Sequence, residues 1–293
     1  FESKGEYTFG GNQTRQELNQ TSMLTLANFW SVNISTRFGL PSLDGAATRG
    51  GPLMGKPLSW GNDIRLNSPF GSRTSWRINY NWNRNAFGGG NDNFGGSLTV
   101  RPTSRWQVTL EPSYQKREDA RQYVTAFDDV AATSTFGRRY LFAFVDRSTM
   151  SVKTRLNYTF SPSLTLEGYA EPFAASGHYH DVGELTAPKS GDITVYGTNG
   201  TTVSRTDDQD WLIGVGGNTF TVGNRDFNVL SLRSNVVLRW EWAAGSTLFL
   251  VWQQNRRASD PSGDPVSFGD LFETTRVGGD NFFALKLTYW LSI

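Results

Sequence analysis

The fold is decided by the C-terminal stretch FALKLTYWLSI, residues 283–293, in which side chains of two kinds alternate. Apolar side chains stand at every second position: Phe283, Leu285, Leu287, Tyr289, Leu291 and Ile293. The positions between them hold Ala284, Lys286, Thr288, Trp290 and Ser292. Because successive side chains of a β-strand point to opposite faces, this pattern predicts a strand with one apolar face and one mostly polar, charged face. A second sheet or lipid must cover the apolar face.

Composition narrows the class of protein. Hydrophobic residues make up 37% of the 293 residues, and the mean hydropathy is -0.44. No apolar run approaches the roughly 20 residues that a membrane-spanning helix needs, which excludes a helical membrane protein. A membrane β-barrel is not excluded, because its strands alternate in polarity and their average hydropathy is low. The 14% of aromatic residues and the 31 glycines suit aromatic girdles and tight turns.

Cysteine and charge exclude further classes. The chain has no cysteine, so disulfides and thiolate chemistry are excluded. The formal net charge is +1 and the basic residues are scattered, which indicates no nucleic-acid partner.

The same alternation recurs along the chain, with connections that are short and long in turn. We expect strands at about 1–10, 14–27, 30–40, 58–68, 74–84, 94–101, 105–117, 120–128, 137–146, 148–160, 163–174, 227–242, 246–257 and 280–293. That is about fourteen strands, with twelve or sixteen as alternatives. An even strand number with short turns on one side and long loops on the other is typical of bacterial barrels.

The predicted fold class is therefore all-β, a single transmembrane antiparallel up-and-down β-barrel over residues 1–293 in a bacterial outer membrane. Both termini and the short turns near 28, 71, 103, 161 and 244 are expected in the periplasm. Long extracellular loops are expected near 41–57, 85–93, 175–226 and 257–279, the third with its own hairpin. A tight link at Asp146 and Arg147 is the one exception to this order. A soluble β fold is the alternative.

Aromatic residues favour the barrel, because Trp and Tyr concentrate where hydrocarbon meets water. The predicted periplasmic girdle consists of Trp30, Trp76, Trp106, Phe160 and Trp242, each near a short turn and on the lipid-facing parity. Trp60 and Trp82 belong to the predicted outer girdle. A soluble core would instead place aromatic residues in the middle of strands.

The opposite parity predicts a charged lumen, lined by Arg77, Asn79, Asn81, Lys153, Arg155, Glu167, Glu171, Arg233, Arg239, Glu241 and Lys286. Lys286 is expected beside Arg239 and Arg256. Basic residues outnumber acidic ones, which favours an aqueous pathway that prefers anions. The alternative is a lumen held together by Arg/Glu ladders. The glycines of residues 48–57 (TRGGPLMGKP) would allow an inward constriction, with a plain surface loop as the alternative.

Motifs for chemistry are scarce. His178 and His180 in GHYHD, with Asp181 or Glu184, are a weak candidate for a metal site, because two histidines are too few ligands. The sequence has no G-x-S-x-G, H-E-x-x-H, P-loop or dinucleotide fingerprint. We therefore expect no catalytic residues, no cofactor and no metal, and we expect that the protein is not an enzyme.

Four segments resemble the C-terminal barrel of the bacterial family known as domain of unknown function 5916. They are TRGGPL (48–53), RLNYTFSPSLTLEGYAEPFAASGHYHDVGEL (155–185), RDFNVLSLRSNVVLRWEWAAGSTLFLVWQQNR (225–256) and FFALKLTYW (282–290). Members typically carry a signal peptide and an N-terminal sandwich similar to carbohydrate-binding modules. The resemblance implies that a periplasmic domain precedes Phe1, and it implies no catalytic residue.

Three functions compete at this stage. The first is a channel or transporter for small polar solutes, saccharides or anions among them. The second is a non-conducting anchor or scaffold for a carbohydrate-binding domain or another periplasmic or surface partner. The third is an embedded outer-membrane enzyme, which no catalytic motif in the sequence supports. In each case the lipid bilayer is the expected surrounding.

Overall fold

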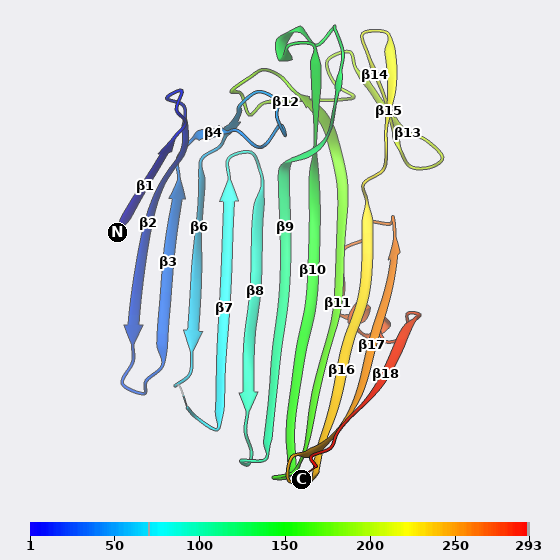
Figure 1. The fold of residues 1–293 in the computed structure, drawn as a ribbon. Helices are drawn as coiled ribbons and strands as arrows, with labels where there is room; N and C mark the ends of the chain where they lie inside the picture. Colours follow the sequence, from blue (N-terminus) through cyan, green and yellow to red (C-terminus); the bar gives the residue numbers. More distant parts are fainter. Residues whose placement is uncertain (70, 292–293) are drawn as a thin grey trace.

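The computed structural model describes residues 1–69 and 71–291, and its main feature is one long antiparallel sheet (Figure 1). Twelve strands follow one another across it in the order β1-β2-β3-β6-β7-β8-β9-β10-β11-β16-β17-β18. Their bounds are β1 Glu2–Tyr7, β2 Gln13–Thr25, β3 Ser31–Gly39, β6 Ser59–Asn67, β7 Thr74–Asn85, β8 Gly90–Val100, β9 Trp106–Asp128, β10 Arg138–Ser161, β11 Leu164–Leu185, β16 Phe227–Ala243, β17 Ser246–Asp260 and β18 Gly279–Thr288. The prediction of an all-β, antiparallel fold is thus confirmed.

The main path of the sheet has twelve strands, the lower of the two alternatives, rather than fourteen, because two predicted turns do not exist in the described residues. Residues 105–128 and 137–160 were each expected to hold two strands, and each holds one, β9 and β10. The two pair with each other from Asp128 and Arg138 down to Trp106 and Tyr158, through Glu118 and Asp146. The anomalous tight link at Asp146 therefore disappears. Likewise, the loop expected near 85–93 is a short turn, because β8 already begins at Gly90.

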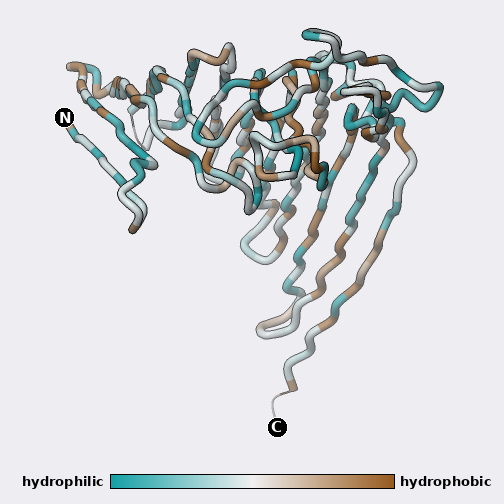
Figure 2. The backbone as a smooth tube through the Cα atoms, turned by 90° about the horizontal axis from the view of Figure 1, so that it is seen from above, coloured by the Kyte–Doolittle hydropathy of each residue, from teal (hydrophilic) through white to brown (hydrophobic). Residues whose placement is uncertain are grey.

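The sheet is curved and its two edge strands stand apart in the view from above (Figure 2). Within the described residues, β1 pairs only with β2, and β18 pairs only with β17. The structure therefore shows an open antiparallel sheet, whereas the alternation predicted a closed barrel. Alternation specifies which way each side chain points, but closure also requires the two edge strands to meet.

Short connections lie along one edge of the sheet, which we call the lower edge, at the bottom of Figure 1. They join β2 to β3, β6 to β7, β8 to β9, β10 to β11 and β16 to β17. The turn between β16 and β17 is the tightest kind, and Gly245 in it has a φ of 78°, which glycine tolerates at little cost. Part of the turn between β6 and β7, and the predicted end of the last strand at 292–293, lie outside the described residues.

The opposite, upper edge carries the insertions. They include β4 (Ser42–Asp44) with β5 (Met54–Lys56), β12 (Ile193–Val195), a short 3-10 helix (Thr133–Thr135) and a three-stranded sheet of β13 (Thr202–Arg205), β14 (Trp211–Val215) and β15 (Asn218–Val222). The segment expected as a loop from residue 175 thus continues β11 to Leu185 and then forms structure of its own. Helix α1 (Phe268–Glu273) lies between β17 and β18. No helix in the described part of the chain is long and apolar enough to cross a membrane.

Two hydrophobic clusters occupy the upper part of β9, β10 and β11. One joins Leu141 and Val145 of β10 to Trp211, Ile213 and other buried residues. The second joins Tyr140 and Phe142, on the other side of β10, to Met54 and Leu185. This upper extension is therefore covered by inserted segments on both faces. For residues 48–57, a surface position and an inward constriction were the two alternatives. Met54 packs on the Tyr140 side of β10, which has the parity of Met150 and not that of Lys153, so the constriction is wrong.

Candidate functional site

The lower part of the sheet separates two kinds of side chain between its faces. A row of registered neighbours crosses eight strands on one face: Ile34, Ile64, Tyr80, Phe94, Tyr114, Met150, Ala174 and Leu230. We call this the apolar face. Many of its large side chains are exposed, among them Ile34, Ile64, Phe94, Leu250 and Leu285. Exposed apolar surface on this scale is unusual for a soluble monomer.

The other side, which we call the polar face, carries every residue of the predicted lumen. Register places Asp63, Asn81, Asn93 and Gln115 in one row. A second row runs from Lys153, opposite Glu111, through Glu171 and Arg233. Arg77, Asn79, Arg155, Glu167, Arg239, Glu241 and Lys286 share this face by the two-residue period of their strands. That the face meets water in a lumen stays a prediction.

Ion pairs connect only part of this face. Arg239 and Glu241 are 3.1 Å apart, and Lys153 and Glu171 are 3.8 Å apart. Arg77 instead donates a hydrogen bond to the amide oxygen of Asn67, at 2.9 Å. Lys286 lies 6.0 Å from the ring centre of Phe249, which pairs with Arg239. The prediction that Lys286 lies beside Arg256 is wrong. Arg256 pairs with Leu232, which has the opposite parity, and it donates a hydrogen bond to the carbonyl of Val277.

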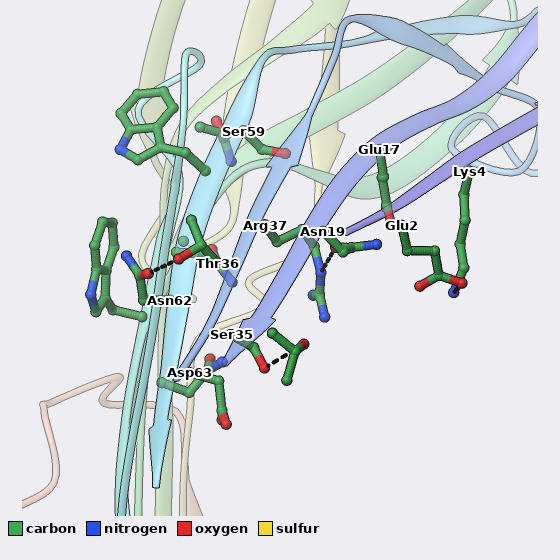
Figure 3. Close-up of a pocket in the computed structure, with 17 residues that line it drawn as sticks. Glu2, Lys4, Glu17, Asn19, Ser35, Thr36, Arg37, Ser59, Asn62 and Asp63 are labelled. Carbon is green, nitrogen blue, oxygen red and sulfur yellow. Dashed lines mark hydrogen bonds and ion pairs between the residues drawn. The ribbon is translucent and has the colours of Figure 1, made fainter. Parts of the chain in front are cut away.

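A hollow of about 460 Å³ lies on the polar face near β1, β2 and β3 (Figure 3). Its lining includes Glu17, Asn19, Arg37 and Asp63, and Figure 3 shows Arg37 donating a hydrogen bond to Asn19. Glu17 also pairs with Arg15 at 2.8 Å. The lining residues of β1 and β2 were not singled out from the sequence, although their alternate spacing could have identified them.

The predicted girdle residues lie on the apolar parity. Near the lower edge, the rings of Trp30 and Trp76 meet edge to face at 5.0 Å, and Trp106 lies 4.5 Å from Tyr158. Phe160 of β10 and Trp242 of β16 belong to the same band near the lower ends of their strands. The ring centres of Trp242 and Trp240 are 6.3 Å apart. Trp60 and Trp82 lie higher, on β6 and β7. Whether the band marks a membrane boundary stays a prediction.

Above Trp82, the apolar face becomes charged. Arg84 pairs with Asp92 at 2.6 Å, and Lys116 pairs with Glu118 at 2.8 Å. Asp92 and Lys116 are registered neighbours, so the charges form a continuous strip. On β10, β11 and β16, the apolar face is covered by Leu271 of helix α1 and by the preceding Val266, which pack on Met150, Ala174 and Leu230. Phe268 and Phe272 of α1 point outward, each 62% exposed.

The two histidines contact different carboxylates and do not share a ligand. His178 lies 3.3 Å from Asp226, and His180 lies 3.2 Å from Asp146 and 2.9 Å from Asp181. Their rings stack at 5.7 Å. Among the described residues, no group of three or more His, Cys, Asp or Glu side chains is arranged to hold a metal ion.

A buried ionic cluster in the upper extension escaped the sequence reasoning. The Arg139 guanidinium is only 7% exposed and contacts both Asp129, at 2.6 Å, and Glu184. The hydrogen bond from Arg139 lowers the pKa of the Asp129 carboxyl, and the backbone N–H of Ala131 adds to this. Burial raises the pKa of the nearby Tyr196 phenol. No local sequence signal marks this cluster, because its members are far apart in the chain.

Comparison with solved structures agrees with the sheet architecture. The chain is similar to the siderophore receptor PiuA from Acinetobacter baumannii, with a TM-score of 0.50 and 9% identity. The match covers 97% of this chain and 45% of the receptor chain. At this identity, the likeness concerns the fold alone. No protein among the curated sequences matches the chain.

The family comparison is more extensive, because one family model matches residues 10–293. That span includes the whole sheet from β2 onward and all the predicted site residues. The chain belongs to the family described as domain of unknown function 5916 (DUF5916).

Proposed function

We propose that this chain forms wall strands of an outer-membrane β-barrel that gives small polar solutes an aqueous path. The observation that carries the proposal is the division of one sheet into a polar face and an apolar face, which is widely exposed except where the α1 region covers Met150, Ala174 and Leu230. Lipid is the surrounding that makes an exposed apolar face favourable, and water is the surrounding that solvates the charged one.

The limits of the apolar face support this orientation. The aromatic band at the lower edge and the charged strip from Arg84 to Glu118 enclose the apolar rows between them. Phe268 and Phe272 on α1 add exposed apolar surface where this helix packs on β10, β11 and β16. We assign the lower edge, toward which the C-terminal strand β18 runs, to the periplasm, and the insertions of the upper edge to the outside. β1 begins higher up, with Glu2 opposite Asn19 of β2, so the expected periplasmic position of the N-terminus stays a prediction.

A bilayer also demands closure. Unpaired backbone N–H and C=O groups cost several kcal/mol each in hydrocarbon, so an open sheet edge does not persist there. Both β1 and β18 have one edge without a partner in the described residues. The proposal therefore requires paired strands at both edges, which complete the barrel.

The polar face supports a preference for anions. Within the described part of the chain, Arg37, Arg77 and Arg155 have no carboxylate within 4.0 Å, whereas Arg65 and Arg239 do. Fixed positive charge that ladders do not neutralise raises the concentration of anions along an aqueous path. Saccharides are also small polar solutes and fall within the proposed class of solute.

A non-conducting anchor is the second candidate, and the upper extension favours it. The sheet of β13, β14 and β15 packs through Trp211 and Ile213 into a buried core, which is a rigid platform for a partner. A protein partner at the surface or in the periplasm would then be the ligand. We propose no catalytic role, no cofactor and no metal.

Planar-bilayer conductance tests the proposal. Purified full-length protein should produce discrete current steps, with a reversal potential in a KCl gradient that indicates chloride preference. The Arg77→Gln and Arg155→Gln double variant should reduce this preference, because it removes two unneutralised charges. Insertion without current would overturn the channel and leave the anchor.

A further inference from the structure

A second hollow on the polar face, of about 390 Å³, lies where β11, β16 and β17 meet. Arg233 of β16 and Arg257 of β17 line it, together with Glu171, Phe173 and Asn255. Register pairs Arg233 with Asn255 and Ser231 with Arg257. The two arginines are therefore diagonal neighbours on one face, roughly 7–8 Å apart at their Cβ atoms.

The charges in this hollow do not balance. In the part of the chain that the structure describes, no carboxylate lies within 4.0 Å of either arginine, and both side chains are exposed to the hollow. Glu171 is the one acidic residue of the lining, and it is already engaged. It accepts a hydrogen bond from the Tyr169 hydroxyl at 2.6 Å and lies 3.8 Å from Lys153.

The contrast with Arg239, further down β16, is informative. Arg239 has Glu241 as an ion-pair partner on its own strand, at 3.1 Å. Neither Arg233 nor Arg257 has an ion pair of this kind, although Glu171 lies directly opposite Arg233 in register, and the two arginines repel each other across the diagonal. A bound anion would remove this repulsion.

We propose that Arg233 and Arg257 form a binding site for an oxyanion, the carboxylate or phosphate of a small organic solute. The planar guanidinium fork matches both groups through paired N–H donors. The Asn255 amide supplies a further donor, and the Phe173 ring offers an apolar wall to the carbon skeleton of the solute. A hollow of this size is at the small end of ligand pockets.

This site deepens the proposed function, on which it rests, by naming the solute class as small organic anions. On the opposite, apolar face, the α1 region covers β10, β11 and β16 through Met150, Ala174 and Leu230. The strand that holds Arg233, β16, is thus supported from its other side.

Isothermal titration of full-length protein in nanodiscs at low ionic strength tests the site. The probes are glucuronate, glucose 6-phosphate and neutral glucose, so that the first two separate carboxylate from phosphate. We expect at least one acidic sugar to bind at least about tenfold more tightly than glucose. Arg233→Gln and Arg257→Gln should each weaken that binding about tenfold, and added salt should weaken it further.

Arg239→Gln is the matched control, because it removes the same charge from the same face of β16. It should change the affinity less than about twofold. Equal binding of glucose, or an equal loss in Arg239→Gln, would overturn the site. If a glutamine variant loses binding and also changes its circular dichroism, the titration is repeated with Arg233→Lys. This variant keeps the charge and should retain part of the affinity.

The two proposals fail separately. Binding of an acidic sugar by a protein that passes no current would retain the site and remove the channel. Ionic current without binding would retain the channel and overturn the site.

Discussion

The lower sheet and the upper extension of β9, β10 and β11 are built from the same strands but cover their faces differently. In the lower sheet, β10 alternates Met150, Val152 and Leu156 on one face with Lys153 and Arg155 on the other. In the upper extension the same strand reads YLFAFV, residues 140–145, and apolar side chains point both ways. Inserted segments cover both faces there, whereas among the described residues only the α1 region is seen to pack in a buried cluster on the lower rows.

The difference teaches what each pattern means. Strict alternation marks a strand whose two faces meet different surroundings, and a continuous apolar run marks a strand buried on both sides. A single strand can hold both patterns in succession. In β11 the change coincides with a bulge near Asp181, whose φ of 48° is rare outside glycine. Substitutions should therefore have different costs in the two regions.

The largest effect is expected at the ionic cluster of the upper extension. Arg139→Ala should destabilise this region by about 3–5 kcal/mol, because it leaves the Glu184 and Asp129 carboxylates without their buried partner. Hydrogen exchange of the amides in β10 and β12 would measure the loss. The neighbour Arg138, paired with exposed Asp128, is the control, and Arg138→Ala should cost less than about 1 kcal/mol. Equal costs would show that the extension is not closed to water.

The lower sheet is tested by two adjacent aliphatic residues of opposite parity. Leu238 lies on the apolar face between Leu166 and Leu250, and Val237 lies on the polar face opposite Glu167. Leu238→Arg should impair membrane insertion by about 2–4 kcal/mol, and Val237→Arg should be tolerated beside that carboxylate. Folding titrations into lipid vesicles would compare them. Similar costs at both positions would contradict the assignment of lipid and water to the two faces.

The smallest effect concerns pH. The pKa of Asp129 is lowered in the folded protein by the Arg139 hydrogen bond, so its contribution is present above the unfolded pKa of roughly 4 and is lost as pH falls through the folded value. Hydrogen exchange around residues 129–137 should therefore accelerate, relative to the lower sheet, only in acid below about pH 4. Asp129→Asn should remove this dependence. A dependence that persists in that variant would assign it to another group.

Much of the lower sheet could be predicted from the sequence. The side chains repeat every two residues, so the parity of Arg77, Glu171 or Leu238 follows once a strand is recognised. Most short turns of the lower edge carry Pro, Gly or Ser, which signal them locally, and the turn at 26–30 is the exception. Arg257 follows the same parity, so its place on the polar face could also be predicted.

Other features could not be predicted in this way. Charged residues at 116–119 and 146–147 looked like turns, because polarity on both sides of a strand resembles a loop. In fact Glu118 and Asp146 are registered partners in a ladder that continues without interruption. Local composition cannot distinguish a charged strip on a strand from a break between strands.

The sequence by itself determined the strand class, the two faces and the identity of the residues on each, because all three depend on neighbours one or two positions apart. Only the tertiary structure decided that β9 and β10 are continuous, that the edges of β1 and β18 stand apart, and that the insertions pack into cores on both sides of the upper extension. It also decided which arginines form ion pairs, since contacts between distant strands give Arg139 its partners and leave Arg233 and Arg257 with no carboxylate within 4.0 Å among the described residues.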